Sequence, residues 1–262
     1  MSEIRNTVTV VTGATQGIGR ALVTALARRG ARLALVAREA EAVEQLQQLL
    51  QSQGVDSFAC PADVGDSAQV KRMMESIHNR FGAIDIVINN AGIGLFQPIA
   101  EARLSDIESV FRTNFYGTLY CTLEALRYMR SRQRGLVVNV SSAIGKHAVY
   151  HQGVYAASKA AIDRMTEALQ AEEAENGIKT LLVIPDRTAT NFRDHVVGDR
   201  RLAVLPGPKI RELSPDTVAE GIVKAIVRDK RVHYCSLRAR VFSLLSVTFP
   251  AVISKLLRPA NV

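Results

Sequence analysis

Short apolar runs alternate with longer amphipathic segments along most of this 262-residue chain. Runs of this kind are typical of strands that are buried on both faces. They lie at residues 7–11, 33–37, 57–61, 84–89, 136–141 and 179–184. Apolar residues at helical spacing occupy residues 39–53, 67–81, 105–132 and 155–176. This alternation predicts an α/β fold, in which one doubly wound parallel sheet with right-handed crossovers is flanked by helices.

Length and composition agree with one soluble α/β domain. The chain has no internal repeat, low-complexity tract or linker that would divide it. Its three cysteines, Cys60, Cys121 and Cys235, lack metal-ligand spacing and leave an odd number, so we expect free thiols, a reducing compartment and no metal site. The first residues lack the apolar stretch of a signal peptide, which favours a cytoplasmic location.

The formal net charge is +8, which raises the question of an anionic partner. The Lys and Arg residues are scattered, and no basic run is interleaved with aromatic residues, so nucleic-acid binding is not expected. The charge is better suited to attracting anionic ligands such as cofactor phosphates, acyl carriers or a lipid surface.

A glycine-rich turn follows the first predicted strand at residues 12–19 and leads into a helix. Such a turn lets the backbone approach a pyrophosphate and directs the free amide groups of the helix toward it. The spacing of Gly13, Gly17 and Gly19 differs from the usual Gly-x-Gly-x-x-Gly dinucleotide motif. An ordinary glycine-rich turn therefore remains the alternative for this segment alone.

Tyr155 and Lys159 stand four residues apart within a predicted helix. That spacing brings both side chains to one face, where an ammonium favours the ionised form of a neighbouring phenol. Taken alone, the pair is more often an ordinary feature of a helix surface.

Together, the glycine turn, the sequence Asn89–Gly92, Ser142 and the Tyr155–Lys159 pair, in this order, resemble the short-chain dehydrogenase/reductase family. The resemblance extends from about Val8 to about Val232. It implies a Rossmann-type fold, a nicotinamide cofactor and assembly as a homodimer or homotetramer. Residues 1–234 then form the Rossmann domain.

The family resemblance assigns catalytic roles to Asn114, Ser142, Tyr155 and Lys159. Tyr155 is the general acid in reduction and the general base in oxidation, while Lys159 lowers its pKa and binds the nicotinamide ribose. Ser142 orients the carbonyl, and Ser141 is expected to point the other way into the packing. Asn114 supports a water that relays protons to Lys159; without its neighbours, it would mark only a local helix kink.

Cofactor preference depends on Arg38, which stands after the second strand where an acidic residue would bind the ribose of NAD. A guanidinium there can hold a 2′-phosphate, so NADP(H) is expected, although Arg38 could be a solvated loop residue. Asp63 resembles the residue that meets the adenine ring, or it caps the next helix. The full predicted cofactor set is Gly13, Thr15, Gln16, Gly17, Ile18, Gly19, Arg38, Asp63, Val64, Asn90, Ala91, Gly92, Tyr155, Lys159, Pro185, Thr188 and Thr190.

The sequence departs from the family after the sixth predicted strand. The family has Pro-Gly where this chain has Pro185-Asp186, which adds a carboxylate near the nicotinamide end. Thr188 and Thr190 remain available to bind the carboxamide. Arg187 could pair with Asp186, or it could face an anionic substrate.

Substrate contacts are expected from residues 191–214, which are long enough to form a lid. Apolar residues near the catalytic positions, such as Ile144 and Val149, predict a lipophilic substrate. Residues 235–262 form an additional apolar and basic amphipathic extension, which is interrupted by Pro250. It could contact a membrane interface, pack in a dimer, or cover a lipophilic pocket.

The predicted function is an NADP(H)-dependent oxidoreductase that transfers hydride between the nicotinamide and a carbonyl or secondary alcohol of a lipophilic substrate. A ketone, an aldehyde, a steroid-like or a fatty-acyl-like compound would suit. The alternative is a non-enzymatic cofactor sensor or scaffold that retains the fold.

Overall fold

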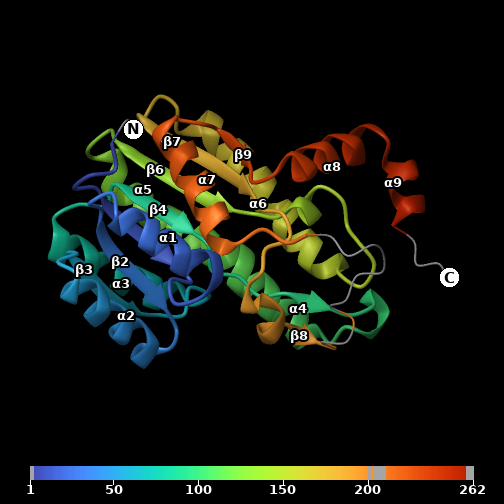
Figure 1. Ribbon diagram of the computed structural model, residues 1–262, viewed down its shortest axis with the longest axis horizontal. Helices are drawn as coiled ribbons and strands as arrows, with labels where there is room; N and C mark the ends of the chain where they lie inside the picture. Colours follow the sequence, from blue (N-terminus) through green and yellow to red (C-terminus); the bar gives the residue numbers. More distant parts are fainter. Residues whose placement is uncertain (1–2, 200–201, 203–210, 258–262) are drawn as a thin grey trace.

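A seven-stranded parallel sheet forms the centre of the computed structural model, which describes residues 3–199, 202 and 211–257 (Figure 1). The strand order is β3-β2-β1-β4-β6-β7-β9. The strands are β1 (Val8–Thr12), β2 (Arg32–Ala37), β3 (Ser57–Pro61), β4 (Ile86–Asn89), β6 (Gly135–Val140), β7 (Ile178–Ile184) and β9 (Val232–Tyr234). The predicted doubly wound α/β fold is confirmed. The strand order reverses between β1 and β4, and ligands of such sheets bind at the carboxyl ends next to this point.

Helices cover both faces of the sheet. One face is covered by α1 (Gly17–Ala27), α2 (Ala40–Ser52) and α7 (Pro215–Val227). The other is covered by α3 (Ser67–Phe81), α5 (Gly117–Arg130) and α6 (Gly153–Glu172). Neighbouring residues of one strand supply opposite cores: Val11 packs with the first group and Val10 with the second, and both are fully buried. Burial on both faces explains the uninterrupted apolar runs of the sequence.

The helical pattern of residues 105–132 is interrupted around Asn114, where the sequence indicated a kink. It consists of α4 (Leu104–Phe111), a π-helical turn η2 (Arg112–Tyr116) and α5. Single π turns insert one residue into a helix and often lie at functional sites. The turn contains Asn114, whose side chain is fully buried.

Beyond the sheet the chain forms two further helices, α8 (Leu237–Thr248) and α9 (Pro250–Leu256), which extend past the body of the sheet (Figure 1, red). Among the helices described, none is both long and apolar enough to cross a membrane by itself. Taken together, α8 and α9 reach the necessary length and composition, with a bend of 119° between them.

The segment that follows β7 contains a short strand, which pairs with another short strand outside the main sheet. Within the predicted lid region, η4 (Asn191–His195) leads into β8 (Val197–Gly198), which pairs in parallel with β5 (Leu95–Phe96). Residues 200–201 and 203–210 of that region, which include Pro206, Gly207 and Pro208, lie outside the described residues. The prediction of a lid there stays a prediction.

Candidate active site

A cavity of about 550 Å³ lies at the carboxyl ends of the strands. It is lined by seventeen of the nineteen predicted site residues: Gly13, Thr15, Gln16, Gly17, Ile18, Arg38, Asp63, Val64, Asn90, Ala91, Gly92, Ser142, Tyr155, Lys159, Pro185, Thr188 and Thr190. Gly19 and Asn114 are buried beside it and do not line it. Residues that follow six different strands of the sheet therefore line one cavity.

The glycine turn between β1 and α1 forms one end of this cavity. Gly13 and Gly17 have φ of 65° and 51°, the left-handed region that favours glycine. At Gly19 an added Cβ would lie 2.0 Å from the Gly13 carbonyl oxygen, so a side chain does not fit. Gln16 begins α1 without a side-chain cap, which leaves the first amide groups of the helix available to an anion.

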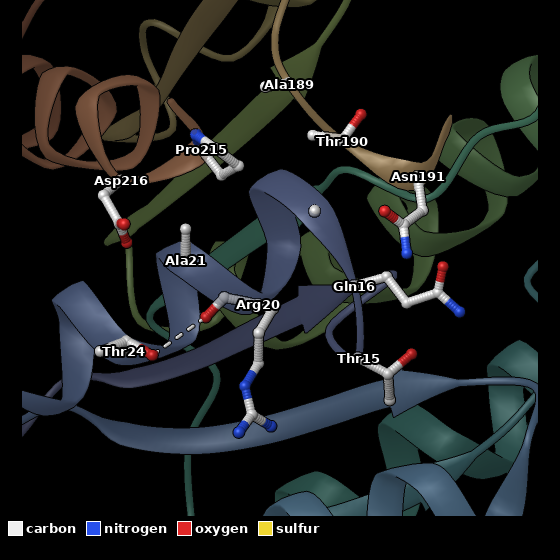
Figure 2. A pocket seen from close by; sticks show the side chains of 11 residues that line it. Thr15, Gln16, Arg20, Ala21, Thr24, Ala189, Thr190, Asn191, Pro215 and Asp216 are labelled. Atoms are coloured by element: carbon white, nitrogen blue, oxygen red, sulfur yellow. Dashed lines mark hydrogen bonds between the residues drawn. The ribbon is translucent and has the colours of Figure 1, made fainter. Parts of the chain in front are cut away.

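A second hollow of about 380 Å³ adjoins the outer side of the same turn. Figure 2 shows Gln16 and Thr15 on the turn, with Thr190 and Asn191 on the segment that faces it. Pro215, at the start of α7, lies on the remaining side. The glycine turn therefore borders a cavity on each side of the start of α1. Residues 190–191 lie over the turn.

Asn90 and its neighbours are fixed against the turn by backbone hydrogen bonds. The Thr12 hydroxyl accepts the N–H groups of Asn90 and Ala91, both at 3.0 Å. At Gly92 an added Cβ would lie 3.1 Å from Asn114 Oδ1 and 3.4 Å from Lys159 Nζ. The absence of a side chain at Gly92 therefore keeps space open beside Lys159.

Arg38 and Asp63 line the end of the cavity next to β2 and β3. Arg38 directly follows β2 and is exposed to solvent. Asp63 accepts the N–H of Gly65 at 2.9 Å, whereas Asp66 caps α3 by accepting the N–H groups of Ala68 and Gln69. The interpretation of Asp63 as the helix cap is therefore wrong, and its side chain is held at the cavity wall by a local turn.

Tyr155 and Lys159 are buried on the same face of α6, with 8% and 4% of their surfaces exposed. The Lys159 ammonium donates to the carbonyl of Val140 at 3.0 Å and lies 5.8 Å from the centre of the Tyr155 ring. Ser142 stands at the start of η3 (Ala143–Gly145), directly beyond β6. Ser141 also belongs to the cavity lining, but its buried hydroxyl is engaged by the backbone, because it donates to the Lys159 carbonyl at 3.2 Å.

Burial dominates the acid–base properties of this pair. It raises the pKa of Tyr155 to about 12, while a hydrogen bond with Ser142 acts in the opposite direction. It lowers the pKa of Lys159 to about 8, opposed by the charge of Asp163 one helical turn away. The expected lowering of the tyrosine pKa by Lys159 is therefore not found in the protein by itself. A buried phenol with a raised pKa is a proton donor at neutral pH.

Asn114 joins three segments around α6. Its side-chain amide donates to the Ile93 carbonyl at 2.9 Å and to the Ser158 hydroxyl at 3.0 Å, and its Oδ1 accepts the Ile93 N–H at 2.8 Å. Its own carbonyl accepts the Thr118 hydroxyl at 2.7 Å. The side chain thus holds α6 against the segment that follows β4.

Comparison with known proteins decides the family. The model of the short chain dehydrogenase family matches residues 7–201, about three quarters of the chain. The chain belongs to the short-chain dehydrogenase/reductase family. An uncharacterized oxidoreductase of Bacillus subtilis, YxnA, is 29% identical over 98% of this chain and 73% of its own length.

Solved structures of the family superpose along the whole chain. A short chain dehydrogenase from Burkholderia cenocepacia, in complex with NADP, has a TM-score of 0.81 and 26% identity, with 98% of this chain and 100% of that chain covered. A Burkholderia phymatum member in complex with NAD has a TM-score of 0.89 over the full length of both chains, and at 23% identity this likeness concerns the fold. The present chain is accordingly a dehydrogenase/reductase, and the non-enzymatic alternative is set aside.

Asp186, which replaces the glycine of the short-chain dehydrogenase/reductase pattern, directs its carboxylate to the start of α8 and to the next backbone N–H. Oδ2 accepts Arg238 Nε at 2.8 Å and the Ser236 hydroxyl, while Oδ1 accepts the Arg187 backbone N–H at 2.7 Å. Thr188 donates its hydroxyl to the Asp186 carbonyl at 2.8 Å. The substitution therefore links the end of β7 to the start of α8.

Sequence reasoning missed several residues of this wall. The cavity is also lined by Phe96, Phe192, Arg193, Ala239, Phe242 and Leu257. The Phe192 ring lies 5.7 Å from that of Tyr155, and Phe242 meets the His147 ring edge-on at 6.4 Å. Single aromatic residues in loops and in the extension carry no periodic signal, so only the fold brings them together. Within the described part of the chain, no cluster of three or more His, Cys, Asp or Glu is arranged to hold a metal ion.

Proposed function

We propose that this protein is an NADP(H)-dependent oxidoreductase that transfers hydride between the nicotinamide and a carbonyl or secondary alcohol of a lipophilic substrate. One observation carries the proposal: Ser142, Tyr155 and Lys159 share a single cavity with the glycine turn and Arg38. The cavity thus offers a phosphate-binding end and a proton-donating end. The absence of a side chain at Gly92, on the wall between these ends, fits a dinucleotide lying in the cavity.

When bound, the reduced nicotinamide would supply the hydride. Tyr155 donates its phenolic proton to the oxygen of the substrate, and its pKa of about 12 keeps it protonated before this step. Ser142 holds the carbonyl by a hydrogen bond. Lys159, held by the Val140 carbonyl, contributes positive charge that stabilises the phenolate as the proton leaves.

Preference for NADP(H) rests on Arg38. The exposed guanidinium at the end of β2 is suited to bind a 2′-phosphate in a bidentate manner. An acidic side chain at this position would repel a 2′-phosphate. This chain has the cationic Arg38 there instead.

A lipophilic substrate is supported by the character of the catalytic end of the cavity. Phe96, Phe192 and Phe242 come from three separate segments and line this end. The third of them lies on α8, so the extension serves as a flap over the pocket. This favours the covering role among the three roles predicted for residues 235–262.

The outer face of the extension is proposed to contact a membrane surface. Leu237, Val247 and Leu256 are 76%, 70% and 73% exposed, whereas Ala239 and Ile253 pack inward. Exposed basic residues on the same helices would meet anionic lipid headgroups. We further propose that the protein is cytoplasmic and assembles as a homodimer or homotetramer. Its contact with the membrane would then be peripheral.

The decisive test follows the loss of reduced-nicotinamide absorbance with NADPH and NADH in parallel, against a panel of lipophilic ketones and aldehydes. Turnover that prefers NADPH is the expected result. Absence of turnover with both cofactors, despite measurable cofactor binding, would contradict the proposed activity.

A further inference from the structure

Arg187 lies two residues beyond Pro185 on the wall of the active-site cavity and is half-buried. Its backbone is fixed: the N–H donates to Asp186 Oδ1, and its carbonyl accepts the N–H of Leu213 at 2.8 Å. The guanidinium makes no hydrogen bond or ion pair with any residue that the structure describes. A half-buried guanidinium with five donors and no acceptor is unusual in a folded protein.

The neighbouring carboxylates are already engaged elsewhere. Asp186 Oδ2 accepts from Arg238 and Ser236, and Glu212 accepts Arg193 Nη2 at 3.1 Å. Both carboxylates therefore neutralise other cations. The sequence left open whether the Arg187 side chain pairs with Asp186. In the structure it does not, because the contact of Asp186 with Arg187 involves only the Arg187 backbone N–H.

Three arginines, Arg187, Arg193 and Arg238, line this wall with two carboxylates, which leaves one positive charge in excess. Burial lowers the pKa of the Arg187 guanidinium, as do the charges of Arg193 and Arg238, with Glu212 and Asp186 opposing them. An arginine nevertheless stays charged at neutral pH, so the excess charge persists. The apolar side chains Phe192 and Phe242 line the same cavity.

We propose that Arg187 binds an anionic group, such as a carboxylate, carried by the substrate at a distance from its reacting carbonyl. The substrate class is then an amphipathic oxo acid or hydroxy acid, with an apolar body against the phenylalanines and an anion on the guanidinium. This rests on the proposed function. The cofactor phosphates have proposed partners of their own in the turn at the start of α1 and in Arg38, which line the same cavity.

The test compares two probes that differ only in charge, 9-oxodecanoic acid and its methyl ester, with NADPH as reductant. In the wild type, kcat/KM for the acid exceeds that for the ester by about tenfold or more, as expected for one charge-assisted bidentate contact. Arg187→Met abolishes this preference and leaves the ester rate within about twofold, whereas Arg187→Lys retains part of it. Arg164→Met, which removes an exposed arginine of α6, is the matched control and retains the full preference.

A second readout separates the two proposals. Thermal stabilisation of the NADP⁺-loaded protein is measured with decanoate and with 1-decanol, and the decanoate effect should depend on Arg187. Equal rates for acid and ester in the wild type, or an Arg187→Met defect confined to the KM for NADPH, would overturn the anion site. Decanoate stabilisation lost in Arg187→Met, without turnover of any carbonyl, would uphold the anion site and refute the proposed reaction.

Discussion

Arg238 at the start of α8 donates its Nε to Asp186 Oδ2 at 2.8 Å, across 52 residues of sequence. Burial raises the pKa of the Asp186 carboxyl, but hydrogen bonds from Arg238, Ser236 and the Arg187 backbone together outweigh it, so the net pKa is lowered. The ion pair therefore forms at neutral pH. Where the family pattern has a flexible glycine, this chain has a residue that binds the start of α8.

Asp186→Ala should loosen α8. We expect faster proteolysis and faster amide exchange in residues 237–248, and a several-fold lower kcat/KM for hydrophobic carbonyls, with unchanged NADPH affinity. The wild type should lose the same contact in acid: the folded pKa lies below the unfolded one, so the stabilisation is present above the unfolded pKa and is lost as pH falls through the folded value. Asp229→Ala, which breaks the surface pair with Lys179, should leave α8 protected.

Lys159 should make stability depend on pH in the alkaline range. Its pKa is about 8 in the folded protein and about 10.4 in an unfolded chain, so between these values the unfolded state binds more protons. Stability then rises as pH increases from 8 to 10. Lys159→Met removes this contribution. Denaturant unfolding at both pH values should give a smaller rise for the variant, and equal rises would show that the lysine is not desolvated.

Arg38→Gln tests the cofactor preference. If the guanidinium binds the 2′-phosphate, kcat/KM for NADPH should fall by about tenfold to a hundredfold, as for the loss of a charge-assisted bidentate contact, while that for NADH changes little. Arg28→Gln, at the far end of α1, provides a control of equal charge. Equal losses with both cofactors would instead indicate damage to the fold.

The outer face of the extension can be tested without disturbing its inner face. Leu244→Glu with Val247→Glu places two carboxylates on exposed positions of α8, which are 56% and 70% exposed. Binding to vesicles that contain anionic phosphatidylserine should be lost because the carboxylates oppose both apolar insertion and charge attraction. Activity on a water-soluble ketone should persist. Unchanged sedimentation with vesicles, together with a smaller oligomer, would assign the face to subunit contact.

Much of the fold is predictable because buried parallel strands leave continuous apolar runs. Residues 57–61 and 67–81 were predicted with the bounds of β3 and α3, since both are bounded by polar or turn-forming residues. The sequence indicated a kink at Asn114 but not its π-helical form, because tertiary contacts with Ile93 and Ser158 stabilise that turn. Two-residue strands such as β5 and β8 are too short to give a pattern.

The candidate site divides in the same way. The glycine turn and the Tyr155–Lys159 pair each lie within a few consecutive residues. Their spacing in the sequence was therefore enough to identify them as candidates. The position of Phe242 in the cavity wall and the Asp186–Arg238 pair depend on contacts between distant segments, and neither has a motif of its own. The family pattern indicated only that Asp186 was unusual, and its role required the position of α8.

Tyr155→Phe removes the proposed proton donor and little else, because the ring still packs against Phe192. We expect kcat for carbonyl reduction to fall by about 10²–10⁴-fold, the usual contribution of a general acid, with NADPH affinity unchanged.

The Tyr155 pKa of about 12 also gives carbonyl reduction and alcohol oxidation different pH dependences in the wild type. Reduction needs the protonated phenol, which is present throughout the neutral range, whereas alcohol oxidation needs the phenolate and should accelerate as pH rises from 7 to 9. Initial rates in both directions measure this. An oxidation rate that is flat with pH, when chemistry limits turnover, would mean that another base accepts the proton.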